Sequence, residues 1–145
     1  FITPTLKGKR VIVTAGPTVE AIDPVRFISN HSSGKQGFAI AEALSNAGAD
    51  VTLIHGPVAI TASSRIKTIA VTPALEMHAA VEKALPADIA ICAAAVADWR
   101  VKPQKNKMKK GAKPPTLTFQ ENPDILLSLS QHKKRPKLGI FCNCF

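Results

Sequence analysis

Residues 9–15 read KRVIVTA, and residues 30–37 read NHSSGKQG directly before the apolar stretch FAIAEALSNAGA at residues 38–49. The first stretch is a nearly continuous β-rich run, which is typical of a strand buried on both faces of a parallel sheet. In the last stretch apolar residues recur at helical spacing, and Gly48 is a natural helix end. The sequence therefore predicts a strand, a long loop over residues 16–33, and a helix.

Strands and helices continue to alternate along the rest of the chain. Further strands are predicted over residues 50–54, 66–71 and 88–95. A helix is predicted over residues 73–85, because Thr72 is a good N-cap and proline suits the first helical position. This alternation implies right-handed crossovers, so we predict an α/β fold with a Rossmann-like, doubly wound, mostly parallel sheet and helices on both faces. An additional edge strand is expected at residues 116–120.

The ends of these strands indicate where a ligand would bind. In doubly wound sheets, ligands lie beyond the carboxyl ends of the strands. That rule gathers four segments around one crevice: residues 16–18, 30–35, 55–56 and 94–98. Ser33, Gly34 and Lys35 precede the predicted helix, where backbone N–H groups and the helix dipole favour a phosphate or carboxylate. The spacing matches neither the Walker A nor the G-x-G-x-x-G pattern, and the alternative is a Ser/Gly-rich loop that only caps the helix.

The formal net charge of +9 is concentrated in two segments. Residues 100–113 hold seven Lys or Arg side chains and no acid, and residues 133–137 hold four more. The rest of the chain is nearly neutral. A nucleic-acid surface would interleave aromatic residues for stacking, but only Trp99 borders the first segment, and we interpret it as a packing residue. Residues 100–113 are therefore either a solvated basic loop or a flap that closes over a polyphosphate.

Composition narrows the class of protein. The chain has 145 residues, 46% of them apolar, which suits one domain with a single core. Without an apolar run long enough to cross a bilayer and without a signal peptide, a cytoplasmic location and no membrane contact are expected. The cysteines have no metal-binding spacing and the four histidines are scattered, so there is no direct metal-ligand signature. Cys92 is expected to be a buried thiol.

Four stretches of the sequence together resemble a known family. They read VIVTAGPTVEAIDPVRFISNHSSGKQGFAIAEAL (11–44), ICAAAVADWR (91–100), KMKK (107–110) and ENPDIL (121–126). In order and spacing they are similar to the phosphopantothenoylcysteine synthetase domain of the bacterial coenzyme A biosynthesis flavoprotein. The resemblance runs through most of residues 6–137, and it implies a Rossmann-like domain that forms homodimers.

The resemblance implies a CTP-dependent ligase of coenzyme A biosynthesis. Members of that family join cysteine to 4'-phosphopantothenate through a 4'-phosphopantothenoyl-cytidylate intermediate, and they release CMP and pyrophosphate. CTP is thus the expected nucleotide substrate, with Mg²⁺, and 4'-phosphopantothenate and cysteine are the other expected partners. In the family a flavin-dependent decarboxylase domain normally precedes this one, and no flavin is expected on residues 1–145.

The resemblance also implies roles for individual residues. Asn30 corresponds to the asparagine that handles the acyl-cytidylate, Arg26 to an arginine tied to substrate handling, and Lys107 to the flap lysine that reaches the triphosphate. These three are the predicted catalytic residues. Asp98 corresponds to a CTP-binding acid that acts through the ribose or the metal. The predicted nucleotide-binding residues are Gly16, Ser33, Gly34, Lys35, Ala93, Ala94, Asp98 and Lys107.

Simpler roles and other functions remain as alternatives. They are an ordinary turn residue for Asn30, a surface ion pair for Arg26, a helix or turn cap for Asp98, and a solvated charge for Lys107. For the whole chain, one alternative is an NAD(P)-dependent reductase, although residues 54–56 lack the carboxylate that an adenosine ribose requires. Another is a basic module that binds nucleic acid through its lysine-rich segment.

The resemblance ends near residue 138. There the family continues into Gly-Phe-Ala-Ala-Glu-Thr, whereas this chain reads GIFCNCF at residues 139–145. The expected organisation is a linker remnant at residues 1–8, an incomplete nucleotide-binding synthetase domain at residues 9–138 and an aberrant tail at residues 139–145. In the family, the part of the domain that follows this point would contact cytosine and cover one side of the sheet. Because this chain lacks that part, impaired ligase activity is expected.

Overall fold

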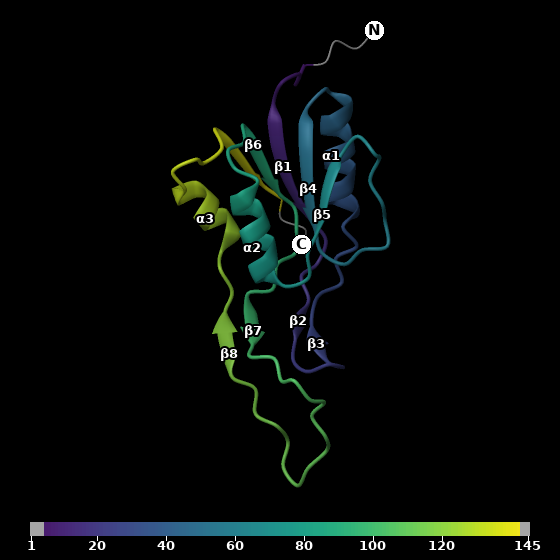
Figure 1. The fold of residues 1–145 in the computed structure, drawn as a ribbon, viewed down its shortest axis with the longest axis vertical. Helices are drawn as coiled ribbons and strands as arrows, with labels where there is room; N and C mark the ends of the chain where they lie inside the picture. Colours follow the sequence, from purple (N-terminus) through teal and green to yellow (C-terminus); the bar gives the residue numbers. More distant parts are fainter. Residues whose placement is uncertain (1–4, 143–145) are drawn as a thin grey trace.

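A parallel sheet of five strands forms the centre of the structure, a computed structural model that describes residues 5–142 (Figure 1). From one edge to the other, the strands are β5 (Lys67–Ala70), β4 (Asp50–His55), β1 (Arg10–Ala15), β6 (Ile89–Cys92) and β9 (Leu138–Phe141). All four neighbouring pairs are parallel. Counted in chain order within this sheet, the order is 3-2-1-4-5, as in doubly wound folds. The predicted α/β fold with a parallel sheet is confirmed.

The side chains of β1 alternate between two cores. Val11 and Val13 belong to the core that α1 (Lys35–Asn46) covers. Ile12 belongs to the opposite core, which α2 (Ala74–Lys83) and α3 (Ile125–Gln131) cover. Because successive side chains of a strand point to opposite faces, helices pack on both faces of the sheet, and Figure 1 shows α2 and α3 on the same side. Burial on both faces explains the continuous apolar run of β1.

The segment predicted as a loop, residues 16–33, contains a short hairpin. In it β2 (Glu20–Ala21) pairs antiparallel with β3 (Phe27–Ile28). The turn is closed by the Asp23 carboxylate, which accepts hydrogen bonds from the N–H groups of Val25 and Arg26 at 2.8 and 2.6 Å. The prediction missed the hairpin because a strand of two residues shows no alternation.

Both long helices begin elsewhere than predicted. The first turn of α1 starts at Lys35, so the last three residues of NHSSGKQG are helical. In α2 the N-cap is Pro73, not Thr72, and the helix begins at Ala74. The buried carboxylate of Glu20 takes over the capping role, because its Oε1 accepts the Ala74 N–H at 2.9 Å. A residue far away in the sequence thus supplies the cap that the local pattern assigned to a neighbour.

The strand expected at residues 116–120 does not join the main sheet. Instead, β8 (Phe119–Glu121) pairs antiparallel with β7 (Trp99–Val101), and residues 102–118 between them form an extended arm (Figure 1). The edge beside β6 is β9, which includes residues 139–141 of the segment predicted as a tail. Two parallel neighbouring strands must be joined by a crossover connection. The connection from β6 to β9 contains α3.

Gly56 allows the backbone after β4 to pack directly against the backbone after β1. A Cβ added at this position would overlap the carbonyl oxygen and carbon of Pro17. Backbone atoms cannot move aside as the end of a flexible side chain can, so this contact requires glycine.

We predict that Gly56→Ala lowers the free energy of unfolding by about 3 kcal/mol or more, because the two backbone segments must separate. Urea unfolding followed by circular dichroism measures the change. Gly139→Ala is the matched control, since an added Cβ there meets nothing within 4 Å. It should change the stability by less than about 0.5 kcal/mol. Equal effects of the two substitutions would contradict the steric argument.

Candidate functional site

A cleft of about 1360 Å³ opens at the carboxyl ends of β1, β6 and β9. Its walls come from the turn before α1, the segment after β6, the loop before α3, and the first residues of β7 and β8. The lining includes Asn30, Ser33, Gly34, Lys35, Ala93, Ala94, Asp98, Trp99, Phe119, Asn122 and Asp124. Segments that are far apart in the sequence therefore meet where ligands bind in parallel sheets.

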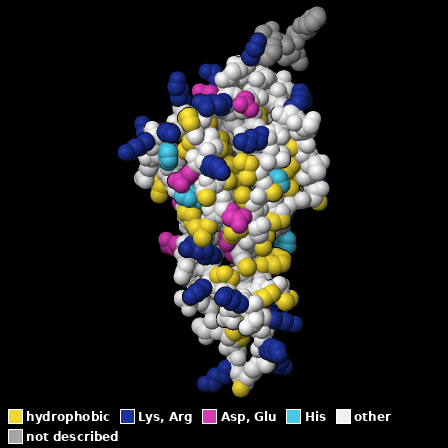
Figure 2. All heavy atoms as spheres, viewed as in Figure 1, with side chains coloured by type: hydrophobic (Ala, Val, Ile, Leu, Met, Phe, Trp, Pro, Cys, Tyr) yellow, Lys and Arg dark blue, Asp and Glu magenta, His cyan; other side chains and the backbone are white. Residues whose placement is uncertain are grey.

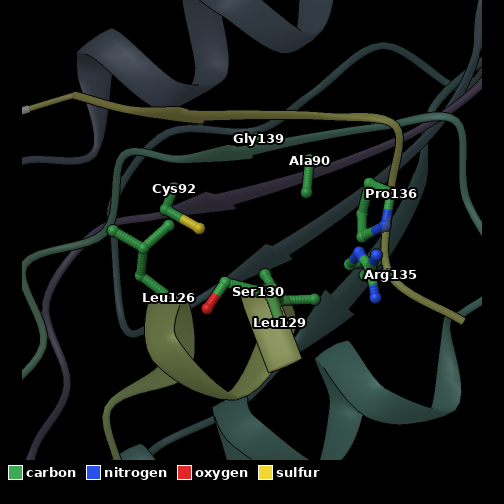
Figure 3. Close-up of a pocket in the computed structure, with 8 residues that line it drawn as sticks. All are labelled: Ala90, Cys92, Leu126, Leu129, Ser130, Arg135, Pro136 and Gly139. Atoms are coloured by element: carbon green, nitrogen blue, oxygen red, sulfur yellow. The ribbon is translucent and has the colours of Figure 1, made fainter. Parts of the chain in front are cut away.

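A second, smaller cavity of about 280 Å³ lies between α3 and β9 (Figure 3). Its lining includes Ala90, Leu129 and Pro136, together with Arg135. None of the predicted site residues lines this cavity, so it carries none of the predicted chemistry.

The turn before α1 presents the N-terminus of that helix to the large cleft. Gly34 is the N-cap residue and has a φ of 76°, a left-handed conformation that suits glycine. The Asn30 side chain holds the turn, since its Oδ1 accepts the Ser32 N–H at 3.0 Å and its Nδ2 donates to the Ala95 carbonyl at 2.8 Å. Because the first helical turn and Lys35 both line the cleft, this wall suits a phosphate group.

The segment after β6 is hydrogen-bonded to the segment that follows β1. The Ala95 N–H donates to the Gly16 carbonyl at 2.9 Å. The Ala97 N–H donates at 2.9 Å to the hydroxyl of Thr18, which is fully buried. These bonds continue the pairing beyond the ends of the strands, and they place the exposed Asp98 at the cleft.

Asn122, which lines the cleft, connects three segments of the structure. Its Nδ2 donates to the Glu20 carboxylate at 3.0 Å and to the Ala97 carbonyl at 2.8 Å. Its Oδ1 accepts from the Arg100 guanidinium at 3.1 Å, and its backbone N–H donates to the Asp98 carbonyl at 2.8 Å. A buried carboxylate such as Glu20 is costly unless it is hydrogen-bonded, so Asn122 both satisfies Glu20 and joins β2, β7 and the segment after β6. No local pattern in ENPDIL indicates this role for Asn122, because its partners are distant in the sequence.

Arg26 and Lys107, two of the predicted catalytic residues, lie outside the lining of the cleft. The Arg26 guanidinium donates to the Asp23 carboxylate at 2.7 Å and to the Met108 carbonyl at 3.1 Å. The Met108 N–H donates to the same carboxylate at 3.0 Å. That bond, together with those from Val25 and Arg26, holds the pKa of Asp23 well below its usual range despite the opposing effect of burial.

Seven of the predicted site residues meet at the cleft. They are Asn30, Ser33, Gly34, Lys35, Ala93, Ala94 and Asp98. Gly16 is not in the lining; it has a φ of 76°, and the space that a side chain would need is taken by Val58. The predicted crevice wrongly included residues 16–18 and 55–56, none of which lines the cleft. The strand β4, which ends at His55, lies on the other side of β1 from β6. The His55 ring packs edge-on against Phe38, with ring centroids 5.3 Å apart.

Trp99, which the sequence indicated as a packing residue, lies outside both apolar cores. Its side chain is 55% exposed and lines the cleft together with Phe119, which is equally exposed. The prediction was wrong because β7 belongs to a two-stranded sheet, separate from the sheet that the helices cover. Cys92 is buried as predicted, and this burial raises the pKa of its thiol to about 11.

Residues 5–142 contain neither a cluster that could hold a metal ion nor a helix that could span a membrane. Within that range, no three His, Cys, Asp or Glu side chains gather in a way that could hold a metal ion. Within the same range, no helix has the length and apolar character needed to cross a membrane.

This chain is similar to known proteins both in sequence and in fold. The family described as "DNA/pantothenate metabolism flavoprotein C-terminal domain" matches residues 6–142. The coenzyme A biosynthesis bifunctional protein CoaBC of Vibrio cholerae is 51% identical over 136 residues, which cover 90% of this chain and 34% of that protein. The chain thus spans about a third of the length of this curated relative.

Two solved structures share the fold. The C-terminal domain of a CoaBC protein superposes with a TM-score of 0.81 at 40% identity, covering 94% of this chain and 65% of that one. A Cab2 mutant in complex with phosphopantothenate-cysteine superposes with a TM-score of 0.74 at 20% identity, covering 91% of this chain and 62% of that one. At that lower identity the likeness is one of fold.

The low pKa of Asp23 predicts how stability depends on pH. A carboxylate whose pKa is lower in the folded state stabilises the fold fully above its unfolded pKa of about 4, and the contribution is lost as the pH falls further. Asp23→Asn should therefore lower the Tm near neutral pH, and its difference from the wild type should shrink below about pH 4. Thermal unfolding at a series of pH values measures this. Asp50→Asn, at an exposed position, is the control, and a difference for Asp23→Asn that is independent of pH would contradict the prediction.

Proposed function

Because the chain belongs to the DNA/pantothenate metabolism flavoprotein C-terminal domain family, we propose that its cleft binds CTP and ligates cysteine to 4'-phosphopantothenate. Membership of this family confirms the resemblance to the phosphopantothenoylcysteine synthetase domain. The main support for the reaction is the meeting of the NHSSGKQG turn, the segment after β6 and the ENPDIL loop in one cleft. Further support is that a relative with this fold binds phosphopantothenate-cysteine, the expected product.

The proposed reaction has two steps. In the first, a carboxylate oxygen of 4'-phosphopantothenate attacks the α-phosphorus of CTP, which forms the acyl-cytidylate and releases pyrophosphate. In the second, the amine of cysteine attacks the acyl carbon, which forms the amide and releases CMP and a proton. Negative charge grows on the leaving groups in both steps, so positioning and electrostatic stabilisation carry most of the catalysis.

The phosphate groups are assigned to the wall formed by α1. Its N-terminal N–H groups suit an anion, the Lys35 ammonium adds a positive charge, and the Ser33 hydroxyl lies in the same lining. The nucleoside is assigned to the wall formed by Ala93 and Ala94, whose small side chains allow a ligand to approach the backbone.

Asn30 is assigned to the acyl group. A carboxamide carries two N–H donors, and one of them donates to the Ala95 carbonyl. We assign the second to the carbonyl oxygen of the acyl-cytidylate, where a neutral donor stabilises the charge that develops during attack by cysteine.

Mg²⁺ fits this cleft as an ion held mainly by the nucleotide. Magnesium is usually bound by one or two carboxylates together with substrate phosphates, and Asp98 and Asp124 both line the cleft. Asp98 is the candidate ligand, since one oxygen of Asp124 already accepts the Leu127 N–H at the start of α3. The ion would neutralise charge on the triphosphate.

The lysine-rich arm carries the last residue with an assigned role, Lys107. We assign Lys107, on the arm, to the triphosphate, where its positive charge would offset the charge of the departing pyrophosphate. We further propose that the domain forms a homodimer and acts beside a flavin-dependent decarboxylase domain. A nicotinamide-dependent reductase is disfavoured, because β4 ends in His55 and offers no carboxylate for an adenosine ribose.

We predict that CTP binds at least about tenfold more tightly than ATP, a difference of about 1.4 kcal/mol. Isothermal titration calorimetry with each nucleotide, in the presence of Mg²⁺, measures both affinities. Equal affinities, or saturable heat from neither nucleotide, would contradict the proposed function.

We predict that Asn30→Ala slows formation of the amide product by about 100-fold, which is the usual cost of removing one donor to a developing oxyanion. The affinity for CTP should change by less than about threefold, since the assigned contact is to the acyl group. Stopped-flow and steady-state assays measure the rates. Asn46→Ala, an exposed asparagine whose Oδ1 accepts only from Arg65 among the bonds described, is the matched control. A wild-type rate for Asn30→Ala would rule out this assignment.

A further inference from the structure

The basic arm, residues 102–118, extends away from the main sheet between β7 and β8 (Figure 1). Figure 2 shows Lys and Arg side chains spread over this part of the surface. Its lysines are Lys102, Lys105, Lys107, Lys109, Lys110 and Lys113, and all of them are exposed. Holding an exposed, lysine-rich arm in one conformation costs conformational entropy. One of its lysines can therefore occupy a defined position only if the arm is attached to the rest of the protein.

The attachment point is the backbone of Met108. Its N–H donates to Asp23 Oδ2 at 3.0 Å, and its carbonyl accepts from the Arg26 guanidinium at 3.1 Å. Arg26 also donates to Asp23 Oδ2 at 2.7 Å, so the two side chains hold both polar groups of one peptide residue. A further bond, from the Gln104 N–H to the Ile22 carbonyl at 2.9 Å, lies nearer the base of the arm.

The two carboxylate oxygens of Asp23 have different hydrogen-bond partners. Oδ1 accepts the N–H groups of Val25 and Arg26 and closes the turn between β2 and β3. Oδ2 accepts the Met108 N–H and the Arg26 guanidinium, and so joins the hairpin to the arm. The Asp23 side chain has no exposed surface, whereas Arg26 is half exposed. Charge-assisted hydrogen bonds shielded from solvent are the strong ones, so the contact is able to fix the arm.

We propose that Asp23, with Arg26, is a positioning residue that fixes Met108 and thereby sets where the neighbouring Lys107 meets the nucleotide. The inference rests on the proposed function, in which Lys107 contacts the triphosphate of CTP. It gives Arg26 a role in holding the arm, in place of direct contact with substrate. Without the Met108 attachment the arm between β7 and β8 becomes a longer free loop, and binding must then restrict more of it.

Trypsin cleavage of the purified chain tests the attachment without any ligand. The bond after Lys107 joins it to Met108 and lies at the attachment, whereas the bond after Lys110 lies further along the arm. Asp23→Asn keeps an oxygen for the hairpin turn and places an amide donor against the Met108 N–H. We expect it to speed cleavage after Lys107 by about tenfold, with less than about a twofold change after Lys110. Asp50→Asn is the control and should change neither rate.

Arg26→Ala provides a second variant, which leaves the Asp23 carboxylate intact and removes the guanidinium bonds. It should also raise cleavage after Lys107 selectively. Unchanged cleavage after Lys107 in both variants, or an equal increase at both bonds, would overturn the attachment.

Affinity for CTP tests whether Asp23 acts through Lys107. Calorimetry would compare the wild type, Asp23→Asn, Lys107→Ala and the double variant, all with Mg²⁺. We expect each single change to weaken CTP binding by about tenfold and the double change to weaken it no further, because one residue acts through the other. Losses that multiply to about 100-fold would overturn the positioning role.

The two tests separate this inference from the proposed function. If the wild type fails to bind CTP, the proposed function fails and the positioning of Lys107 fails with it, whatever trypsin reports. If the wild type binds CTP but Asp23→Asn leaves the arm protected, only the positioning inference is wrong.

Discussion

The whole site depends on a close approach of backbones at the carboxyl end of β1. Gly56 packs on the backbone of Pro17, and Gly37 packs against Ala15, at distances that leave no room for a Cβ. These contacts draw the first turn of α1 onto the strand end, and hydrogen bonds from Ala95 and Ala97 attach the segment after β6 beside it. The cleft exists because three backbones meet there with few side chains between them, which leaves N–H groups near the place where an anion would lie.

Two buried carboxylates attach the smaller sheets to this centre. Glu20 accepts the first N–H of α2 and the amide of Asn122, and Asp23 accepts from its own turn and from Met108. Isolated buried charges are costly, so the hydrogen-bond partners of each carboxylate stabilise it in its buried position. The β2–β3 hairpin thereby couples α2, the ENPDIL loop and the basic arm. The parts that would contact substrate are thus held by polar bonds, while the main sheet is held by apolar packing.

Much of the fold was predictable, and the misses concern very short strands and contacts between distant segments. The strands of the main sheet up to β6, and the helices beside them, were readable because each repeats a pattern over several residues. Seven of the predicted site residues line one cleft, because the carboxyl ends of neighbouring parallel strands lie at one edge of the sheet. The hairpin, the cap from Glu20, the hub at Asn122 and the exposure of Trp99 were missed. The hairpin strands are too short to show an alternating pattern, and the other features depend on contacts between segments far apart in the chain.

The sequence by itself determined the alternation of strands and helices up to β6, the two apolar faces of β1, the family, and the concentration of charge in residues 100–113. Those properties are local, or sum over neighbours, so they can be read without coordinates. Only the tertiary structure decided that Arg26 holds Met108 instead of lining the cleft, and that β4 ends away from it. Hydrogen bonds between distant segments depend on where the backbone returns, and no local pattern of residues encodes that position.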